Sequence, residues 1–389
     1  MKKVVMFFRG GLFPVNMGSR RYMAGLAGYL NSCPDIDLKL VCMGGCPRPE
    51  ERDRYLKIAK SVEWISAPRR FGLFDVLNKV FSRLGVDMLN SFFTALAVRK
   101  RFMASCADAD KVIVNYAVWY PLMPRRFRRE KCAVITHDLV YYRRASFGGT
   151  ETWWKRFKVL ANRLIELRVL ASYARIGVLG DYEKSELINR GVDERNIIHT
   201  GFPMEVGEVY QPQMKKYDFV FVGGGVGGAP VLSLEMFFRR VAGIISGRKI
   251  SVAVTRAETW NWDAIHIPPN VELIKFGFVE NLGKLLSETR IGIGTIPVGS
   301  GVKTKVMEMM MNNMLVVATD HAIEGIPADG RAYINIDHSS DSDIRNWIID
   351  VLNDDRCMYE IGRQNGTRIR EAFAPENCLK GVVDWIEER

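Results

Sequence analysis

The chain has 389 residues, which at about 100–200 residues per domain predicts two or three domains. Hydrophobic residues make up 48% of the chain and charged residues 25%, a balance that excludes disordered and fibrous proteins. The longest stretch without a charged side chain, residues 219–234, is rich in glycine and is too short for a membrane span of about 20 apolar residues.

Cysteine and histidine usage indicates the compartment and argues against a zinc site. Seven cysteines and five histidines are scattered through the chain without a C-x-x-C pair or a Cys/His cluster. This pattern favours free thiols in a reducing cytoplasm and predicts that no metal is bound. The apolar run at residues 4–8 is too short for a secretory signal, so we expect a cytoplasmic protein.

The positive charge belongs to the first half of the chain. The net charge is +11, with +16 in residues 1–200 and −5 in residues 201–389, and this asymmetry predicts an anionic partner for the first half. Aromatic residues accompany clustered cations in segments 88–101, 119–129 and 153–158, a combination typical of a bilayer interface. A solvated basic surface over core aromatics is the alternative. Nucleic acid is disfavoured because no nucleic-acid-binding module is recognisable.

Short apolar runs alternate with helical patterns along the first half, which predicts β-α-β units and a parallel sheet. The predicted strands are 3–8, 37–43, 62–66, 111–116, 132–136 and 175–179. The main predicted helices are 20–31, 75–106 and 152–172.

A second α/β series follows residues 201–213, which we interpret as a linker. Its predicted strands are 218–222, 249–255, 271–276, 291–295, 315–319 and 332–336. Its predicted helices are 231–246, 282–287, 304–312, 341–353, 356–372 and a last one at 375–388. Two such series predict two Rossmann-like domains facing a cleft, with ligands beyond the carboxyl ends of the strands.

The segment from residue 291 to 326 carries the most informative pattern. A strand is followed by a loop containing Gly299 and Gly301, and a helix begins near Thr304. Free backbone N–H groups at that helix start, beside Lys303 and Lys305, form an anion site, and glycines let a diphosphate approach closely. Glu308, one turn further on, can accept both hydroxyls of a ribose. The alternative is that Lys303, Lys305 and Glu308 are only solvent-facing residues of the helix and that the glycines only permit the turn.

The pattern G-x-G-x-K-x-K-x-x-E over residues 299–308, followed by V-V-A-T at 316–319 and E-G at 324–325, resembles the donor region of GT-B glycosyltransferases of the retaining family 4. Weaker similarities follow in the family's order, so the resemblance covers nearly the whole chain. They are P-V-N-M-G-S-R-R at 14–21, T-H-D at 136–138, residues 177–203, F-V-F-V-G at 219–223 and N-V-E-L-I-K-F-G-F-V at 270–279.

The resemblance implies an α/β GT-B fold whose C-terminal helix crosses back to the first domain. The acceptor-side domain would then comprise residues 1–203 with helix 375–389, and the donor-binding domain residues 204–374. The implied reaction moves a sugar from a nucleotide-diphospho-sugar to a lipid-linked or cell-surface glycan acceptor, with retention of configuration. No cofactor or metal is implied besides this co-substrate. With the basic first half, the resemblance implies a peripheral protein on the inner face of the cell membrane.

The resemblance also assigns residues. It implies catalytic roles for His137, Lys305 and Glu308. The donor-binding residues that it implies are Gly18, Gly223, Gly224, Arg256, Phe278, Val279, Gly299, Ser300, Gly301, Val302, Lys303, Thr304, Lys305 and Glu308. Many family members carry a glutamate where this chain has Ser300, a departure that marks a subgroup and leaves the donor sugar open. An arginine often found near residues 223–229 is missing, so Arg256 or the lysine pair is expected to supply the phosphate charge.

Several alternatives remain at this stage. Gly223-x-Gly225-x-x-Gly228 spells a dinucleotide fingerprint, but its acid is misplaced, since Glu258 comes about 30 residues later. Asp108-x-Asp110 precedes its strand, so a GT-A metal site is unsupported. The alternative for His137 is a loop histidine whose hydrogen bonds are all made within the protein. The methionines at 307–314 indicate helix core. A GT-B nucleotide-sugar epimerase and a non-catalytic GT-B-like binding protein are the alternative functions.

Overall fold

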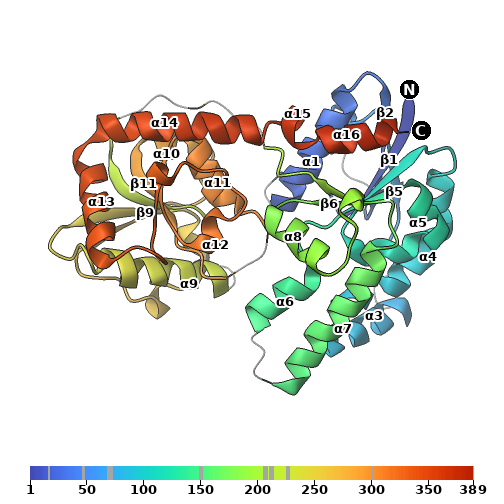
Figure 1. The fold of residues 1–389 in the computed structure, drawn as a ribbon, viewed down its shortest axis with the longest axis horizontal. Coiled ribbons are helices and arrows are strands. Elements are labelled where there is room, and N and C mark those ends of the chain that lie inside the picture. The colour runs from blue at the N-terminus through green and yellow to red at the C-terminus, as the bar shows by residue number, and fades with distance from the viewer. Residues whose placement is uncertain are drawn as a thin grey trace. The chain divides into compact units, whose positions relative to one another are not determined.

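The computed structural model describes residues 1–15, 18–45, 49–67, 73–148, 152–204, 209, 214–224, 228–298 and 301–388. The chain forms two compact units, Met1–Met204 with Phe373–Arg389, and Glu205–Ala372 (Figure 1). Each unit is a parallel β-sheet covered by helices, which confirms the predicted pair of Rossmann-like α/β domains. In the described part of the chain, no helix is both long enough and apolar enough to cross a membrane.

The sheet of the first unit has seven parallel strands in the order β3-β2-β1-β4-β5-β6-β7. Central strand β1 is buried on both faces, with Phe7 paired to Val41 of β2 and Val114 of β4, which explains its unbroken apolar run. The strands are β1 Lys2–Arg9, β2 Ile36–Met43, β3 Ser61–Ile65, β4 Lys111–Asn115, β5 Cys132–Ile135, β6 Arg175–Val178 and β7 Ile197–His199.

Helices cover both faces of this sheet. One face packs against α4, α7 and α8, and the other against α1 and the C-terminal helices, where the ring of Trp385 is fully buried. The helices are α1 Gly18–Ser32, α2 Pro49–Leu56, α3 Leu73–Leu84, α4 Phe92–Ser105, α5 Arg125–Lys131, α6 Val140–Gly148, α7 Trp153–Leu170 and α8 Asp181–Asn189, with 3₁₀ turns η1 Asp87–Leu89, η2 Ala117–Leu122 and η3 Glu194–Asn196.

The predicted helix at residues 75–106 is wrong, because the structure has two helices there, α3 and α4. The break lies at Gly85, whose φ of 72° is incompatible with a right-handed helix. The Asn162 side chain of α7 holds this break, donating to the Gly85 carbonyl (2.8 Å) and accepting from the Met88 N–H (3.2 Å). A tertiary contact therefore stabilises a turn that the helical periodicity did not indicate.

The sheet of the second unit has six parallel strands in the order β10-β9-β8-β11-β12-β13. In β11, Gly292 and Gly294 leave space for Met309 and Val306 of α11, since a Cβ at these glycines would lie 2.7 and 3.1 Å from those side chains. The strands are β8 Tyr217–Phe221, β9 Ile250–Val254, β10 Val271–Lys275, β11 Thr289–Gly294, β12 Leu315–Ala318 and β13 Tyr333–Asn335.

The helices of the second unit cover both faces of its sheet. Phe237 of α9 shares one core cluster with Ile344 and Ile348 of α13 and with residues of β8, β9 and β11. The methionines of α11 are buried on the other face, which confirms the prediction that they form helix core. The helices are α9 Gly228–Phe237, π-helical η4 Phe238–Ala242, η5 Ala257–Thr259, η6 Trp262–Ala264, α10 Leu282–Ser287, α11 Thr304–Met311, α12 Asp320–Ile323, η7 Gly330–Ala332, α13 Asp341–Asn353 and α14 Asp355–Ala372.

After α14 the chain returns to the first unit, as the fold class predicted. The predicted helix at 375–388 consists of two shorter helices, α15 Pro375–Cys378 and α16 Lys380–Glu387, which meet at Leu379. They pack on α1, β1 and β7, and in Figure 1 the red α16 lies beside the blue α1. Most of the predicted linker at 201–213 lies outside the described residues.

Only one of the three aromatic and basic segments exposes its aromatic residues. In segment 119–129, Trp119 is buried, and Arg128 is also buried, where it donates to the carbonyls of Tyr120 and Met123 at 2.7 Å each. In segment 88–101, Phe92 and Phe93 are half-buried, with ring centres 5.4 Å apart. The core alternative therefore fits Trp119, and membrane contact by these two segments stays a prediction. Segment 153–158 differs, because Trp153 is 75% exposed.

Candidate functional site

The order of strands in the second unit reverses direction between β8 and β11. Ligands of open parallel sheets bind outside the carboxyl ends of the strands at such a switch point. The chain leaves β8 through Gly223 and Gly224, and it leaves β11 through the loop that leads to α11. The predicted donor residues near positions 223 and 303 therefore follow the two strands that frame the expected ligand position.

Lys305 of α11 reaches across to the end of β8. Its Nζ atom is the nearest atom to the place that a Cβ on Gly223 would occupy, and any such side chain would have to displace it. Gly223 has a φ of 141° and donates its N–H to the Thr255 hydroxyl at 2.8 Å. A residue with a side chain fits poorly there both for space and for backbone conformation. The structure thus brings together Gly223 and Lys305, which lie 82 positions apart in the sequence.

Arg256 follows β9 and lies on the same edge of the sheet. Its backbone is in the left-handed region, with φ 53°, and its N–H donates to the Gly277 carbonyl at 2.9 Å. Its guanidinium carbon lies 5.7 Å from the centre of the Phe278 ring, which is itself 68% exposed. The Thr259 hydroxyl donates to the Arg256 carbonyl at 2.8 Å and lies 2.6 Å from where a Cβ on Gly224 would be. A left-handed non-glycine residue held by its neighbours is typical of functional sites.

The charges at this edge favour an anion. The pKa of Lys305 is lowered, first by desolvation of its ammonium group against the protein and next by the positive charge of Arg256, while the Glu308 carboxylate acts in the opposite direction. Two neighbouring cations repel each other, and a negative ligand bound between or beside them offsets this repulsion. A diphosphate at this position would therefore relieve the repulsion between Lys305 and Arg256.

Helix α11 begins beside these cations. Its N-cap residue Lys303 makes no side-chain cap, and its Nζ donates instead to the Gly301 carbonyl at 2.5 Å. Gly301 has a φ of 67°, which turns the loop into the helix start next to Val302 and Thr304. Backbone N–H groups at a helix start favour anions. The two predicted loop residues Gly299 and Ser300 lie outside the described residues.

The remaining predicted donor residues lie on the same unit. Glu308 is half-buried one turn after Thr304, on α11. Val279 is half-buried and Phe278 exposed in the segment after β10, the edge strand next to β9. The Arg256 guanidinium lies over the Phe278 ring, and its positive charge acts on Lys305. The donor-binding roles of all these residues, Glu308 and Val279 included, stay predictions.

The first unit has its own switch point, between β1 and β4. Helix α1, which begins at Gly18, comes from the loop after β1, and Tyr116 follows β4. The Tyr116 hydroxyl hydrogen-bonds the Ser19 side chain, so the start of α1 is joined to the end of β4. His137 follows β5, two residues after its last strand residue Ile135.

Aromatic rings and one asparagine hold the His137 ring in place. It stacks on Tyr116 with ring centres 4.3 Å apart and meets the edge of Tyr22 at 5.0 Å. Its Nε2 lies 2.9 Å from Oδ1 of Asn115. Asn115 donates its own amide to the Phe7 carbonyl at 3.0 Å, so Oδ1 must accept and Nε2 must carry the proton. Nδ1 is therefore the unprotonated nitrogen and can accept a hydrogen bond from a hydroxyl.

Burial lowers the pKa of His137 to about 3, so the imidazole is neutral at physiological pH. In the unfolded chain the histidine pKa is about 6.5. Below pH 6.5 the unfolded state takes up a proton that the folded state refuses, so this residue lowers the free energy of unfolding as pH falls from about 6.5 towards 3. We expect His137→Asn, which tolerates the left-handed backbone at φ 60°, to reduce the loss of melting temperature between pH 7 and pH 5. Equal losses in wild type and variant would contradict the assignment.

Backbone strain concentrates at these two edges. Within the described ranges, the non-glycine residues with positive φ are Tyr116, His137, Arg256 and Asn313. Tyr116 directly follows β4, and His137 and Arg256 come two residues after the ends of β5 and β9, so all three lie at carboxyl ends of strands. Such strain persists only where surrounding contacts fix it, and it is common at functional sites. Asn313 has a structural explanation, because its side chain accepts from Arg370 at 3.0 Å.

The sequence did not single out Asn115, Tyr116, Thr255 or Thr259. Asn115 is fully buried and Thr255 nearly so, and each orients a predicted site residue through a hydrogen bond. One signal was available, because a polar residue directly after an apolar strand run lies at the sheet edge where ligands bind. Their hydrogen-bond partners, however, come from other strands and follow only from the tertiary structure.

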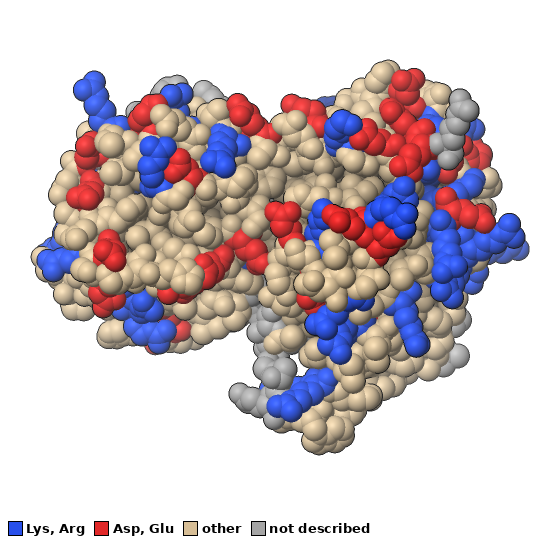
Figure 2. Space-filling view, viewed as in Figure 1, with Lys and Arg blue, Asp and Glu red and all other residues tan. Residues whose placement is uncertain are grey.

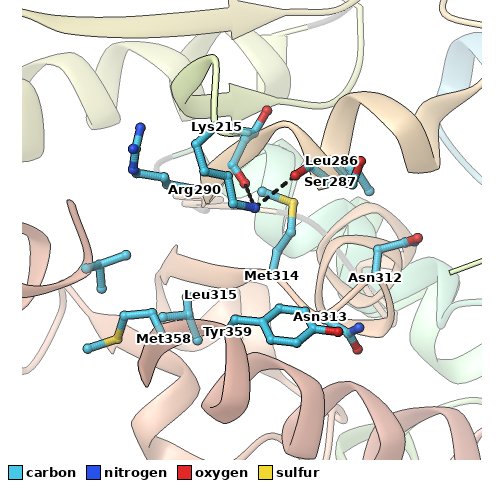
Figure 3. Close-up of a pocket in the computed structure, with 12 residues that line it drawn as sticks. Lys215, Leu286, Ser287, Arg290, Asn312, Asn313, Met314, Leu315, Met358 and Tyr359 are labelled. Atoms are coloured by element: carbon cyan, nitrogen blue, oxygen red, sulfur yellow. Dashed lines mark hydrogen bonds between the residues drawn. The ribbon is translucent and has the colours of Figure 1, made fainter. Parts of the chain in front are cut away.

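A pocket of about 460 Å³, open to solvent, lies at the opposite edge of the second sheet, where Thr289 begins β11 and Leu315 begins β12 (Figure 3). None of the predicted site residues lines it. Figure 3 shows the Lys215 ammonium directed at two backbone carbonyls, those of Ser287 (2.9 Å) and Thr289 (3.0 Å). Its charge already serves the fold, so we assign no function to this pocket. Among the described residues, no three His, Cys, Asp or Glu side chains are grouped closely enough to hold a metal ion.

Neither a protein-family model nor a curated protein matches the chain. Solved structures do match over nearly its whole length. TarM matches with a TM-score of 0.69 at 12% identity, covering 100% of this chain and 99% of that one. The chain has a GT-B fold. A glycosyltransferase from Rickettsia africae matches with a TM-score of 0.62 at 10% identity, and sucrose-phosphate synthase from Thermosynechococcus elongatus with 0.64 at 11%, each covering 99% of this chain and 98% of its own. At these identities the similarity establishes the GT-B fold alone.

Proposed function

We propose that this chain is a glycosyltransferase that moves a sugar from a nucleotide-diphospho-sugar to a glycan acceptor. The second unit binds the donor at the ends of β8 and β11, and the first unit presents the acceptor near His137. The observation that carries the proposal is the Lys305 ammonium packed over the bare backbone of Gly223, at the switch point of a GT-B fold. A glycine, a lysine and the start of a helix lie together at this edge of the sheet, and a diphosphate site needs this combination.

The second unit supplies the charge that the reaction needs. When the bond between the sugar and the diphosphate breaks, negative charge develops on the departing phosphate. Lys305, Arg256 and the N-terminal N–H groups of α11 would stabilise that charge. These groups belong to the protein, so we propose that the reaction needs no metal and no cofactor. Glu308 would accept the ribose hydroxyls.

The first unit contributes a neutral histidine. With Nε2 committed to Asn115, Nδ1 of His137 can accept a hydrogen bond from a sugar hydroxyl or from the reacting hydroxyl of the acceptor. Its lowered pKa makes a cationic role unfavourable near pH 7, so it positions a hydroxyl without adding charge. We propose transfer with retention of configuration, in keeping with the resemblance to the retaining family 4.

The acceptor class follows from the basic half of the chain. We propose a lipid-linked or cell-surface glycan intermediate of polysaccharide biosynthesis, used by a peripheral protein at the cytoplasmic face of the membrane. Two of the solved structures with the same fold carry related names: one TarM structure contains UDP and α-GlcNAc-glycerol, and another protein is a sucrose-phosphate synthase. These names support a nucleotide-sugar donor for this chain.

A thermal-shift screen of UDP, GDP, ADP and CMP sugars tests the proposal. One nucleotide class should raise the melting temperature of the purified protein, because a ligand that binds only the folded state stabilises it. The same sugar should then be transferred, or hydrolysed slowly in the absence of acceptor. A shift with no released nucleotide under any condition would favour a binding protein, and a changed sugar with an intact diphosphate would identify an epimerase. No shift with any donor would overturn the proposal.

A further inference from the structure

One helix of the first unit exposes a continuous apolar stripe. On α7 the exposed apolar side chains are Trp153 (75% exposed), Phe157 (49%), Leu160 (42%) and Leu164 (52%). At 3.6 residues per turn these four positions fall on one face. The polar side chains of Asn162 and Glu166 lie on the opposite face and are buried. The helix therefore exposes an apolar face, while its inward face buries two polar groups as well as Val169 and Leu170.

Hydrogen bonds to the rest of the unit fix this orientation. Asn162 bonds to the Gly85 carbonyl and the Met88 N–H, and the Glu166 carboxylate accepts from the N–H groups of Val140 and Tyr141 at 3.0 Å each. The helix cannot rotate to bury its stripe without breaking these buried bonds, which is costly. Exposure of the stripe is thus specified by the fold.

A second helix of the first unit, α3, also exposes an apolar face. Val76, Val80 and Leu84 are 51%, 47% and 44% exposed, with Lys79 and Arg83 exposed on the same side. Asn78, on the buried side of α3, donates to Thr94 at 2.7 Å and holds the helix against α4. Asn162, on the inward face of α7, bonds to Gly85 directly after α3, so the end of α3 is joined to α7. We call the exposed faces of α3 and α7 together the α3–α7 surface.

Cations flank the stripe of α7. Arg156 and Arg163 lie on one side of it and Arg168 on the other, judged by the helical angle of about 100° per residue. The Lys158 ammonium lies 5.4 Å from the Trp154 ring, which stacks on Phe157. The only acidic residue of α7 is the buried Glu166. Figure 2 shows Lys and Arg side chains gathered over the part of the first unit that carries α4, α5 and α7.

We propose that the α3–α7 surface docks on an anionic lipid bilayer, which rests on the peripheral location given in the proposed function. Aromatic and aliphatic side chains enter the headgroup region while the flanking arginines meet lipid phosphates. A second copy of the chain is a poor occupant, because it would place the same cations opposite one another. Nucleic acid is also a poor occupant, since Leu160, Leu164 and Val80 have no rings for base stacking.

Flotation with liposomes tests the docking surface. The wild-type protein should float with vesicles of 30% phosphatidylserine in phosphatidylcholine at low salt, and flotation should fall at high salt because the surface potential is screened. Two triple variants remove different parts of the surface: Trp153→Gln with Phe157→Gln and Leu164→Gln, and Arg156→Gln with Arg163→Gln and Arg168→Gln. Each should lower the vesicle partition coefficient by at least about 10-fold.

A matched control removes three arginines from α5 of the same unit, by Arg125→Gln, Arg126→Gln and Arg129→Gln. These side chains are exposed, whereas their neighbour Arg128 is buried and is therefore left unchanged. The control should float within about twofold of wild type, since attraction falls off within a Debye length of the surface. Brominated lipid should quench the fluorescence of wild type more than that of a Trp153→Phe, Trp154→Phe variant.

Two outcomes of the flotation experiment would overturn the docking surface, and a third outcome would reassign it. One is wild type that ignores anionic vesicles at low salt. The other is an α7 variant that floats like wild type while the α5 control does not. A dimer that the apolar α7 variant dissociates, without flotation of wild type, would assign the surface to a second copy and also reject the bilayer. The nucleotide-sugar thermal shift, measured on the same proteins, separates this result from the transferase proposal, because donor binding to the second unit needs no membrane.

Discussion

Lys305→Ala should weaken nucleotide-sugar binding by about 1–3 kcal/mol, because it removes a charge-assisted hydrogen bond to the diphosphate. Gly223→Ala should cause a loss of similar size by another route. Its methyl group would occupy the position of the Lys305 ammonium, and its backbone would be strained at φ 141°. Glu308→Ala should also weaken binding by about 1–3 kcal/mol if the carboxylate holds the ribose hydroxyls. Isothermal titration with the donor found in the screen measures all three.

Lys216→Ala is the matched control for these variants. It removes the same charge from the second unit, but Lys216 immediately precedes β8, at the opposite edge of the sheet, where it pairs with Glu288 at 2.8 Å. Its donor affinity should stay near that of wild type. Lys305 is an exposed residue whose ammonium lies over Gly223 and outside the apolar core, so the Lys305→Ala protein should fold. Unchanged donor affinity in that folded variant would refute the assignment of the donor site.

His137→Ala should lower kcat on the order of 10²-fold or more, the loss typical when one positioned hydrogen-bonding group is removed from a reacting centre. The residue lies in the first unit and the nucleotide contacts lie in the second, so the affinity for the nucleotide should change little. We therefore expect a loss of turnover with little change in nucleotide affinity. Single-turnover kinetics measures the first, and titration with the free nucleoside diphosphate measures the second.

Two further variants serve as controls for His137→Ala. His137→Asn keeps a side chain that accepts the left-handed backbone, which separates loss of the imidazole from backbone strain. His199→Ala removes an exposed histidine of the same unit and should leave turnover unchanged. If His137→Ala mainly weakened nucleotide binding and kept its turnover at saturation, the residue would belong to the nucleotide site and not to the reacting centre.

The neutral state of His137 depends on residues that are distant from it in the sequence. T-H-D after an apolar run indicated a histidine at the carboxyl end of a strand, and the structure has it there. Its tautomer depends on Asn115 at the end of β4, and its low pKa comes from burial. Tyr116, which follows β4, and Tyr22 of α1 pack on the ring. No spacing rule connects residues 22, 115 and 137, because the order of strands in the sheet decides which strand ends become neighbours.

The aromatic and basic segments show that composition alone does not determine which side chains are exposed. Segments 119–129 and 153–158 have similar composition, yet Trp119 is buried and Trp153 is 75% exposed. Arg128 is buried against the carbonyls of Tyr120 and Met123 at the end of η2, and its removal would cost each of them a hydrogen bond. Composition gave the charge of the region, and only the packing of α5 and α7 determined which side chains reach solvent.

Local pattern was sufficient where the determinant is itself local. Apolar runs of five to eight residues separated by helical periodicity specify buried parallel strands and their covering helices, because each period buries one face or both. The glycines and lysines between β11 and α11 likewise mark a helix start suited to an anion. By itself, therefore, the sequence pattern determined two parallel α/β sheets, and the returning C-terminal segment followed from the family resemblance. The anion site between β11 and α11 stays a prediction.

Tertiary structure alone decided which residues meet at each sheet edge and which face of a helix is exposed. The break at Gly85 depends on Asn162, the position of Lys305 depends on Gly223, and the exposed stripe of α7 depends on the buried bonds of Asn162 and Glu166. Each of these pairs is far apart in the sequence. Their contacts form only when strands are ordered in a sheet, since burial and hydrogen bonding of a side chain depend on the elements packed against it.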